Sequence, residues 1–182
     1  MALNAYSSEV HKVLDVALKI DPDSIWKVCE AILADADSSR AYYVGRWLTG
    51  SLVGQQTEPA IKKISPNALW EWVEEQPAER ARYLAMLLPH DLLSEERGHS
   101  LSRALLVRYG KLRDVRSALV HNYLTEGWAG PASAHYSAEK NRLLSYKSHE
   151  NNEFVKRFVD DLIEVLDRQI ERALVEEERE RF

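Results

Sequence analysis

Apolar residues recur at intervals of three and four along most of the chain, which is the spacing of one face of an α-helix. No stretch alternates apolar and polar residues as a half-buried strand does. The pattern therefore predicts an all-α protein. The predicted helices cover approximately residues 8–20, 23–36, 40–54, 67–75, 78–88, 101–109, 112–124, 133–147 and 151 towards the C-terminus.

Serine and proline mark the helix ends. Ser65-Pro66 has the N-cap and first-position residues of a helix, and Gln76-Pro77 ends that helix and begins the next. Residues 55–64 are the least regular and predict a loop with one helical turn. We expect one helical-repeat domain, 1–182, whose parts are the first helices (1–54), an irregular linker (55–64), helix pairs (65–150) and a long terminal helix (151–182).

A weak internal repeat is present. Leu33, Leu69, Leu105 and Leu143 each lie in an apolar helix that is followed by polar residues and a second helix, at intervals of 36, 36 and 38 residues. Helix pairs of this length are typical of an α-solenoid, in which each pair covers the apolar face of the next. An irregular helical bundle is the alternative. Either way, the last three of these leucines are expected to be buried.

Several features follow one another from Ile64 onwards. Ser65-Pro66 opens a helix that contains tryptophan, Arg80 lies at the start of its partner helix, residues 124–131 form a Trp-Gly loop, and a Glu/Arg-rich tail ends the chain. In these features the chain resembles the C-terminal HEAT-like repeats of large bacterial multidomain proteins, some of them STAND-type NTPases associated with anti-phage defence. The resemblance implies a scaffold, sensor or docking module for a protein partner or for other domains, with catalysis located elsewhere.

Composition limits the candidate chemistry. The sequence has no GxxxxGK[ST] phosphate loop, and its six histidines lack metal-ligand spacing, so we expect no cofactor and no metal. The one cysteine, Cys29, lies in an apolar helical segment and is expected to be a buried hydrophobe. A single cysteine and the absence of a signal peptide or membrane-spanning stretch suggest the cytoplasm. Whether Met1 is a natural start is left open.

Basic residues are concentrated between Leu101 and Arg116, although the net charge of the chain is −5. An excess of this kind can bind phosphate, a nucleic acid or an acidic partner. The alternative is a solvated helix face on which arginine stems cover apolar surface. Trp72 lies two positions after Trp70, so we expect Trp70 inside and Trp72 partly exposed as an interface anchor. The candidate binding residues are Arg103, Arg108, Lys111, Arg113 and Trp72.

One motif suggests catalysis instead. Arg116, His121 and Tyr123 have the spacing R-x4-H-x-Y, which resembles the motif of HEPN-type ribonucleases, including toxins that have a partner nucleotidyltransferase as inhibitor. The resemblance implies a metal-independent reaction: His121 would act as general acid or base on a ribose 2′-hydroxyl, and Arg116 would stabilise charge on the phosphate. Side chains five positions apart on a helix differ by about 140°, so they share a face only in a distorted helix or a dimeric site.

The predicted last helix carries an apolar stripe, formed by Val155, Val159, Leu162, Leu166, Ile170 and Leu174. This stripe predicts either a dimer seam or the face that covers the rest of the fold. Three hypotheses follow. The leading one is a non-enzymatic helical-repeat interaction module, and the alternatives are a HEPN-like ribonuclease and a helical subunit that dimerises through its last helix.

Overall fold

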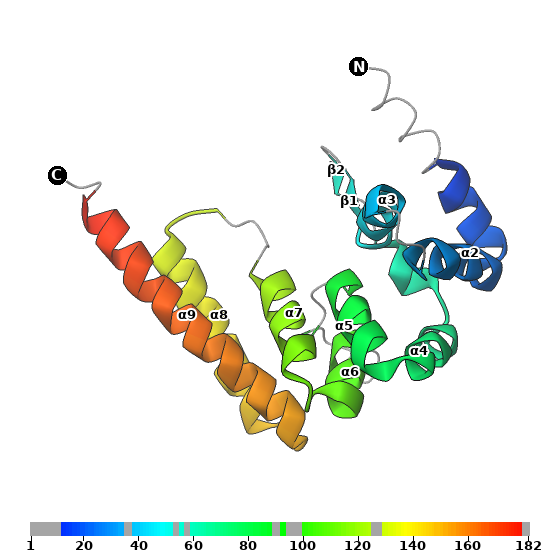
Figure 1. The fold of residues 1–182 in the computed structure, drawn as a ribbon. Helices are drawn as coiled ribbons and strands as arrows, with labels where there is room; N and C mark the ends of the chain where they lie inside the picture. Colours follow the sequence, from blue (N-terminus) through cyan, green and yellow to red (C-terminus); the bar gives the residue numbers. More distant parts are fainter. Residues whose placement is uncertain are drawn as a thin grey trace. The chain divides into compact units, whose positions relative to one another are not determined.

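The computed structural model describes residues 12–34, 38–52, 55–56, 59–88, 92–93, 100–124 and 129–179, and these are almost entirely helical (Figure 1). Residues 12–20 form a first helix. The helices that follow are α2 (Pro22–Ala34), α3 (Ser38–Leu48), α4 (Pro66–Glu75), α5 (Pro77–Leu87), α6 (Leu101–Tyr109), α7 (Arg113–Tyr123), α8 (Ala132–Ser148) and α9 (Glu153–Arg179). The prediction of an all-α chain that ends in a long helix is confirmed.

Three short elements lie between α3 and α4. The two-residue strands β1 (Ser51–Leu52) and β2 (Gln55–Gln56) pair in antiparallel register, and the sequence pattern did not predict them. A 3-10 helix, η1 (Ala60–Lys63), follows and provides the single helical turn expected between residues 55 and 64. Of the predicted Trp-Gly loop, residues 124–131, the central positions 125–128 lie outside the described residues.

Side chains cap the N-termini of α4 and α2. The Ser65 hydroxyl accepts a hydrogen bond from the Ala68 N–H (3.2 Å), and Pro66 occupies the first turn of α4. At the start of α2 the Ser24 N–H donates to the Asp21 carboxylate (3.1 Å), and the hydrogen bonds from Ser24 lower the pKa of Asp21. These side chains bond N–H groups that have no partner within the helix.

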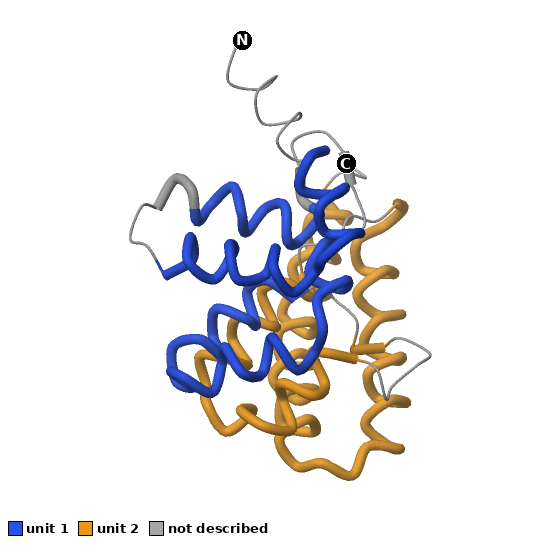
Figure 2. The backbone as a smooth tube through the Cα atoms, turned by 90° about the vertical axis from the view of Figure 1, so that its right-hand side faces the viewer, with its two compact units in different colours: residues 1–89 blue, residues 90–182 orange. Residues whose placement is uncertain are grey.

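The chain divides into two compact units, Met1–Pro89 and His90–Phe182, drawn in blue and orange in Figure 2. The boundary between the two units falls inside the segment 65–150, for which the sequence predicts helix pairs. Unit 1 contains α2 to α5, and unit 2 contains α6 to α9.

Tryptophans dominate the core of unit 1. Trp26 and Trp47 are almost completely buried, and the Trp47 indole N–H donates to the Asp15 carboxylate (2.9 Å) of the first helix. The rings of Trp26 and Trp72 meet edge to face, with their centroids 5.4 Å apart. Trp70 and Trp72 are 8% and 6% exposed, so the prediction that Trp72 is partly exposed is wrong. The reason is that both sides of α4 are covered, with α2 packing on the side that carries Trp72.

Cys29 also belongs to this core. It is 2% exposed and forms no disulfide, as expected of a small buried hydrophobe. Burial, with a smaller contribution from the charge of Glu30, raises the pKa of the thiol to about 12. The thiolate that nucleophilic or redox chemistry requires is therefore strongly disfavoured in the folded chain.

Unit 2 is organised around α9, which lies along α8 and also packs against α6 and α7 (Figure 1). Leu105 of α6 and Leu143 of α8 are fully buried, as is Leu69 of α4 in unit 1, so the expected burial of all three leucines is confirmed. The apolar stripe of α9 is buried from Val155 to Leu166, whereas Leu174 is 53% exposed. Most of the stripe therefore packs within unit 2. No helix in the described part of the chain is both long and apolar enough to cross a bilayer.

Candidate functional site

Arg103 does not offer a free charge, because it forms a two-pronged ion pair inside unit 2. Its Nε and Nη2 donate to the two carboxylate oxygens of Glu150, at 2.8 and 3.0 Å. The side chain of Glu150 is only 3% exposed and lies in the turn between α8 and α9. Arg103 thus ties α6 to this turn, and its role is at least partly structural.

Glu150 collects further donors at the same turn. The backbone N–H groups of Asn151 and Asn152 donate to its Oε1 (2.8 and 2.9 Å), and the Tyr146 hydroxyl donates to its Oε2 (3.2 Å). Burial by itself would raise the pKa of Glu150. The hydrogen bonds from Arg103 and from the two backbone N–H groups outweigh burial and lower the pKa to about 2.

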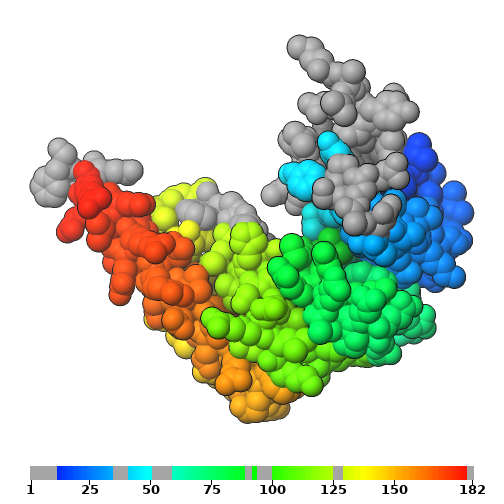
Figure 3. All heavy atoms as spheres, viewed as in Figure 1, coloured from blue at the N-terminus to red at the C-terminus, as the bar shows by residue number. Residues whose placement is uncertain are grey.

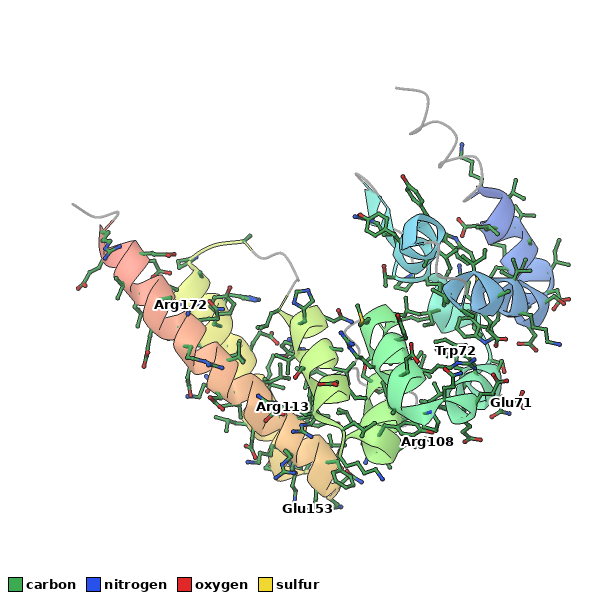
Figure 4. All side chains as sticks on the ribbon, in the orientation of Figure 1. Glu71, Trp72, Arg108, Arg113, Glu153 and Arg172 are labelled. Carbon is green, nitrogen blue, oxygen red and sulfur yellow. The ribbon has the colours of Figure 1, made fainter. Side chains whose placement is uncertain are left out.

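The other predicted basic residues are exposed. Arg108 lies near the end of α6, Lys111 in the turn that follows, and Arg113 in the first turn of α7, and Figure 4 labels Arg108 and Arg113. Trp72 belongs to α4 of unit 1, so the predicted binding set is divided between the two units.

The three residues of the R-x4-H-x-Y motif all lie on α7, but each has different surroundings. Arg116 is 9% exposed, and its Nε donates to the Asp161 carboxylate of α9 at 2.7 Å. Its Nη1 donates to the Gly110 carbonyl oxygen at 2.6 Å. Tyr123 is buried and donates its hydroxyl to Glu139 of α8 (2.7 Å), whereas His121 is exposed. Within one chain, the structure therefore does not turn Arg116 and His121 towards a common substrate atom.

Gly110 explains why Arg116 points inwards. A Cβ on Gly110 would overlap the Leu106 carbonyl oxygen of α6 and would lie 2.8 Å from Cβ of Phe154, so the turn between α6 and α7 passes close to α9. The carbonyl of Gly110 is buried in this contact and requires a donor. The Arg116 guanidinium supplies that donor and binds α9 at the same time.

The structure also contains a pocket that the sequence pattern does not predict. It has a volume of about 690 Å³ and lies in unit 1, between residues of α2 and α3 and residues of α4 and α5. The lining is Leu33, Ala34, Ala41, Tyr42, Gly45, Arg46, Thr49, Trp72, Gln76, Glu79, Arg80, Tyr83, Met86 and Leu87. Of these, only Trp72 was among the predicted binding residues. We call this feature the α2–α5 pocket.

Two arginines of the α2–α5 pocket lie against aromatic rings. Arg46 lies 5.7 Å from the centre of the Tyr42 ring and donates to the Tyr42 hydroxyl (2.9 Å). Arg80 lies 5.4 Å from the centre of the Trp72 ring, donates to the Trp72 carbonyl oxygen (2.9 Å) and pairs with Glu75. These contacts fix both guanidinium groups over ring faces, where cation–π attraction stabilises them.

A second acidic residue, Glu30, is close enough to Glu75 for the two charges to interact. Burial, and then the negative charge of Glu75, raise the pKa of Glu30 on α2, whereas Arg80 opposes the shift. The pocket lining has charges of both signs, Arg46, Arg80 and Glu79, and Arg80 also interacts with Glu75 and Glu30, which do not line the pocket. The sequence held one signal for this site, because Tyr42, Tyr83 and Met86 fall on the polar sides of their helices, where a large apolar residue has no core to fill.

Among the described residues, no group of three histidine, cysteine or acidic side chains is placed to hold a metal ion. Comparison of the chain with protein-family models, with curated proteins and with solved structures finds no match. The resemblances to HEAT-like repeats and to HEPN ribonucleases therefore rest on the sequence motifs alone and remain predictions.

Proposed function

We propose that the chain is a non-enzymatic helical interaction module and that the α2–α5 pocket receives apolar side chains of a protein partner. The observation that carries this proposal is the combination of a pocket of about 690 Å³ with exposed apolar side chains at its edge. Tyr42, Tyr83 and Met86 are 56%, 45% and 49% exposed, so each presents apolar surface to solvent.

The residue types in the pocket support a protein partner. Tryptophan, tyrosine, methionine and arginine are the residues enriched at the centres of protein interfaces, where rigid aromatic groups give a large contact area at low entropic cost. The α2–α5 pocket contains all four types, and the rings of Tyr42 and Trp72 are already held by arginines. A surface that is ordered before binding loses less entropy when a partner docks.

The helix pairs fit the same proposal. Short connections join α4 to α5 and α6 to α7, and Leu69 and Leu105 are buried in those pairs, as repeats of a short solenoid would require. We therefore keep the HEAT-like solenoid, and its role as the sensor or docking part of a larger bacterial defence-type assembly, as a proposal. The ribonuclease hypothesis has less support, because internal bonds occupy both Arg116 and Tyr123.

Site-specific photo-crosslinking tests the pocket. A benzophenone amino acid placed at Tyr83, in the cells that make the protein, is expected to give a protein adduct. Ala34→Phe should reduce that adduct at least about tenfold, since Ala34 is an exposed residue of the pocket wall and a ring there occupies the site of the partner.

The matched control is the same crosslinker at Tyr43, which is 48% exposed on α3 but does not line the pocket. It should give little of the adduct seen from Tyr83. Equal adducts from both positions, or an adduct at Tyr83 that Ala34→Phe leaves unchanged, would show that the partner does not bind in the pocket.

A further inference from the structure

Unit 2 has a basic surface, centred on the turn between α6 and α7. Four basic side chains on it are exposed, Arg108, Lys111, Arg113 and Arg157. The first three are close in sequence, and Arg157 comes from α9. We call these four residues the α6–α7 basic surface.

Two contacts place Arg157 beside the turn. Phe154 of α9 lies against Gly110, and Asp161 of α9 pairs with Arg116 of α7. On a helix, position 157 lies on the same side as positions 154 and 161, because residues three and four apart are neighbours. Arg157 is therefore on the side of α9 that faces the α6–α7 turn and α7. In the space-filling view this turn and the start of α9 lie next to each other at the surface (Figure 3).

Among the described residues, four acids around this surface are bound to bases outside it, at positions 150, 153, 160 and 161. Glu150 pairs with Arg103 and Asp161 with Arg116, as described above. Lys156 binds Glu153, and Lys147 binds Asp160. Glu153 and Asp161, the acids one turn either side of Arg157, are thus engaged by Lys156 and Arg116. Asp114 is the one exposed acid on α7 next to Arg113, so the α6–α7 basic surface keeps an excess of positive charge.

We propose that the α6–α7 basic surface binds a short acidic segment of a polypeptide. Three of its four bases are arginines, whose planar guanidinium groups match carboxylates in two-pronged geometry. This interaction is separate from the α2–α5 pocket, which lies in unit 1 and takes apolar side chains.

A long nucleic acid fits this surface less well than a short acidic peptide. Further along α9, residues 164–179 carry six acidic and three basic side chains, and this net negative charge repels a polyanion that continues past the basic surface. Tyr109 and Phe154, the aromatic residues described beside the surface, are both partly buried, so neither offers an open ring on which a base can stack.

Fluorescence anisotropy with a labelled glutamate-rich peptide tests this proposal at low ionic strength. The double variant Arg113→Glu, Arg157→Glu should weaken binding at least about tenfold, and added salt should weaken binding to the parent protein. The matched control is Lys62→Glu, Arg82→Glu, which changes the net charge equally with two exposed bases of unit 1 that do not line the pocket. It should change the affinity less than about threefold.

Three other outcomes would overturn the proposal. Equal losses in the two double variants would mean that net charge alone attracts the peptide. Tighter binding of a labelled single-stranded RNA than of the peptide, with the same sensitivity to Arg113→Glu, Arg157→Glu, would make this a nucleic-acid surface. Absence of peptide binding at low salt would exclude the site. Because all these variants leave the α2–α5 pocket unaltered, a failure here is independent of the crosslinking result.

Discussion

Replacing Arg116 with methionine is expected to lower the free energy of unfolding by about 3 kcal/mol. Methionine fills part of the same space but donates no hydrogen bond. The buried Gly110 carbonyl would then lose its donor, and the contact from α7 to Asp161 on α9 would disappear. Urea denaturation of the two proteins at neutral pH measures the difference.

The matched control for this prediction is Arg142→Met. Arg142 pairs with Glu139, three positions earlier on α8, and its side chain is 59% exposed. An exposed pair contributes little, so this variant should lose less than about 1 kcal/mol. If Arg116→Met were as stable as the Arg142→Met control, Arg116 would have no structural role, and its charge would again be a candidate for catalysis.

Acid is expected to destabilise unit 2 through Glu150. The pKa of this carboxyl is about 2 in the folded chain against an ordinary value of 4.5, so the ionised form stabilises the fold fully above about 4.5. The stabilisation is lost as the pH falls from 4.5 towards 2, because the unfolded chain binds the proton first. A shift of this size corresponds to about 3 kcal/mol.

Glu150→Gln isolates this contribution from other carboxyls. The variant keeps the size of the side chain but has no charge to pair with Arg103, so it should be less stable than the parent at pH 7. The difference in stability between the two proteins should shrink as the pH approaches 2, because the Glu150 carboxyl of the parent then also becomes neutral. Glu164→Gln removes an exposed carboxylate of α9 whose ion pair with Arg168 spans 3.8 Å, so its stability should follow that of the parent at every pH. If the free energies of unfolding of the parent and of Glu150→Gln differed by the same amount at pH 7 and at pH 2, Glu150 would not be the source of the acid sensitivity.

Local chemistry explains which parts of the fold were predictable. The bounds of α6, Leu101–Tyr109, agree with the sequence prediction, and Ser65 caps α4 as expected, because both depend on residues a few positions apart. The burial of Leu69, Leu105 and Leu143 follows from apolar periodicity in the same way.

Contacts between distant residues explain what the sequence did not show. Arg103 and Glu150 are 47 positions apart, and Arg116 and Asp161 are 45 apart, so no local pattern reveals that these arginines are paired. The burial of Trp72 depends on Trp26, which comes from α2. The α2–α5 pocket requires side chains from four helices, and its volume exists only once they pack.

Metal-free incubation with labelled structured RNA most directly tests whether the chain functions by binding rather than by catalysis. His121→Ala is the appropriate variant, since His121 is exposed and its loss leaves the core intact, whereas changes at Arg116 also destabilise the fold. We predict that neither the parent protein nor His121→Ala cleaves the RNA. Cleavage by the parent that is lost in His121→Ala would contradict the proposal and establish a ribonuclease.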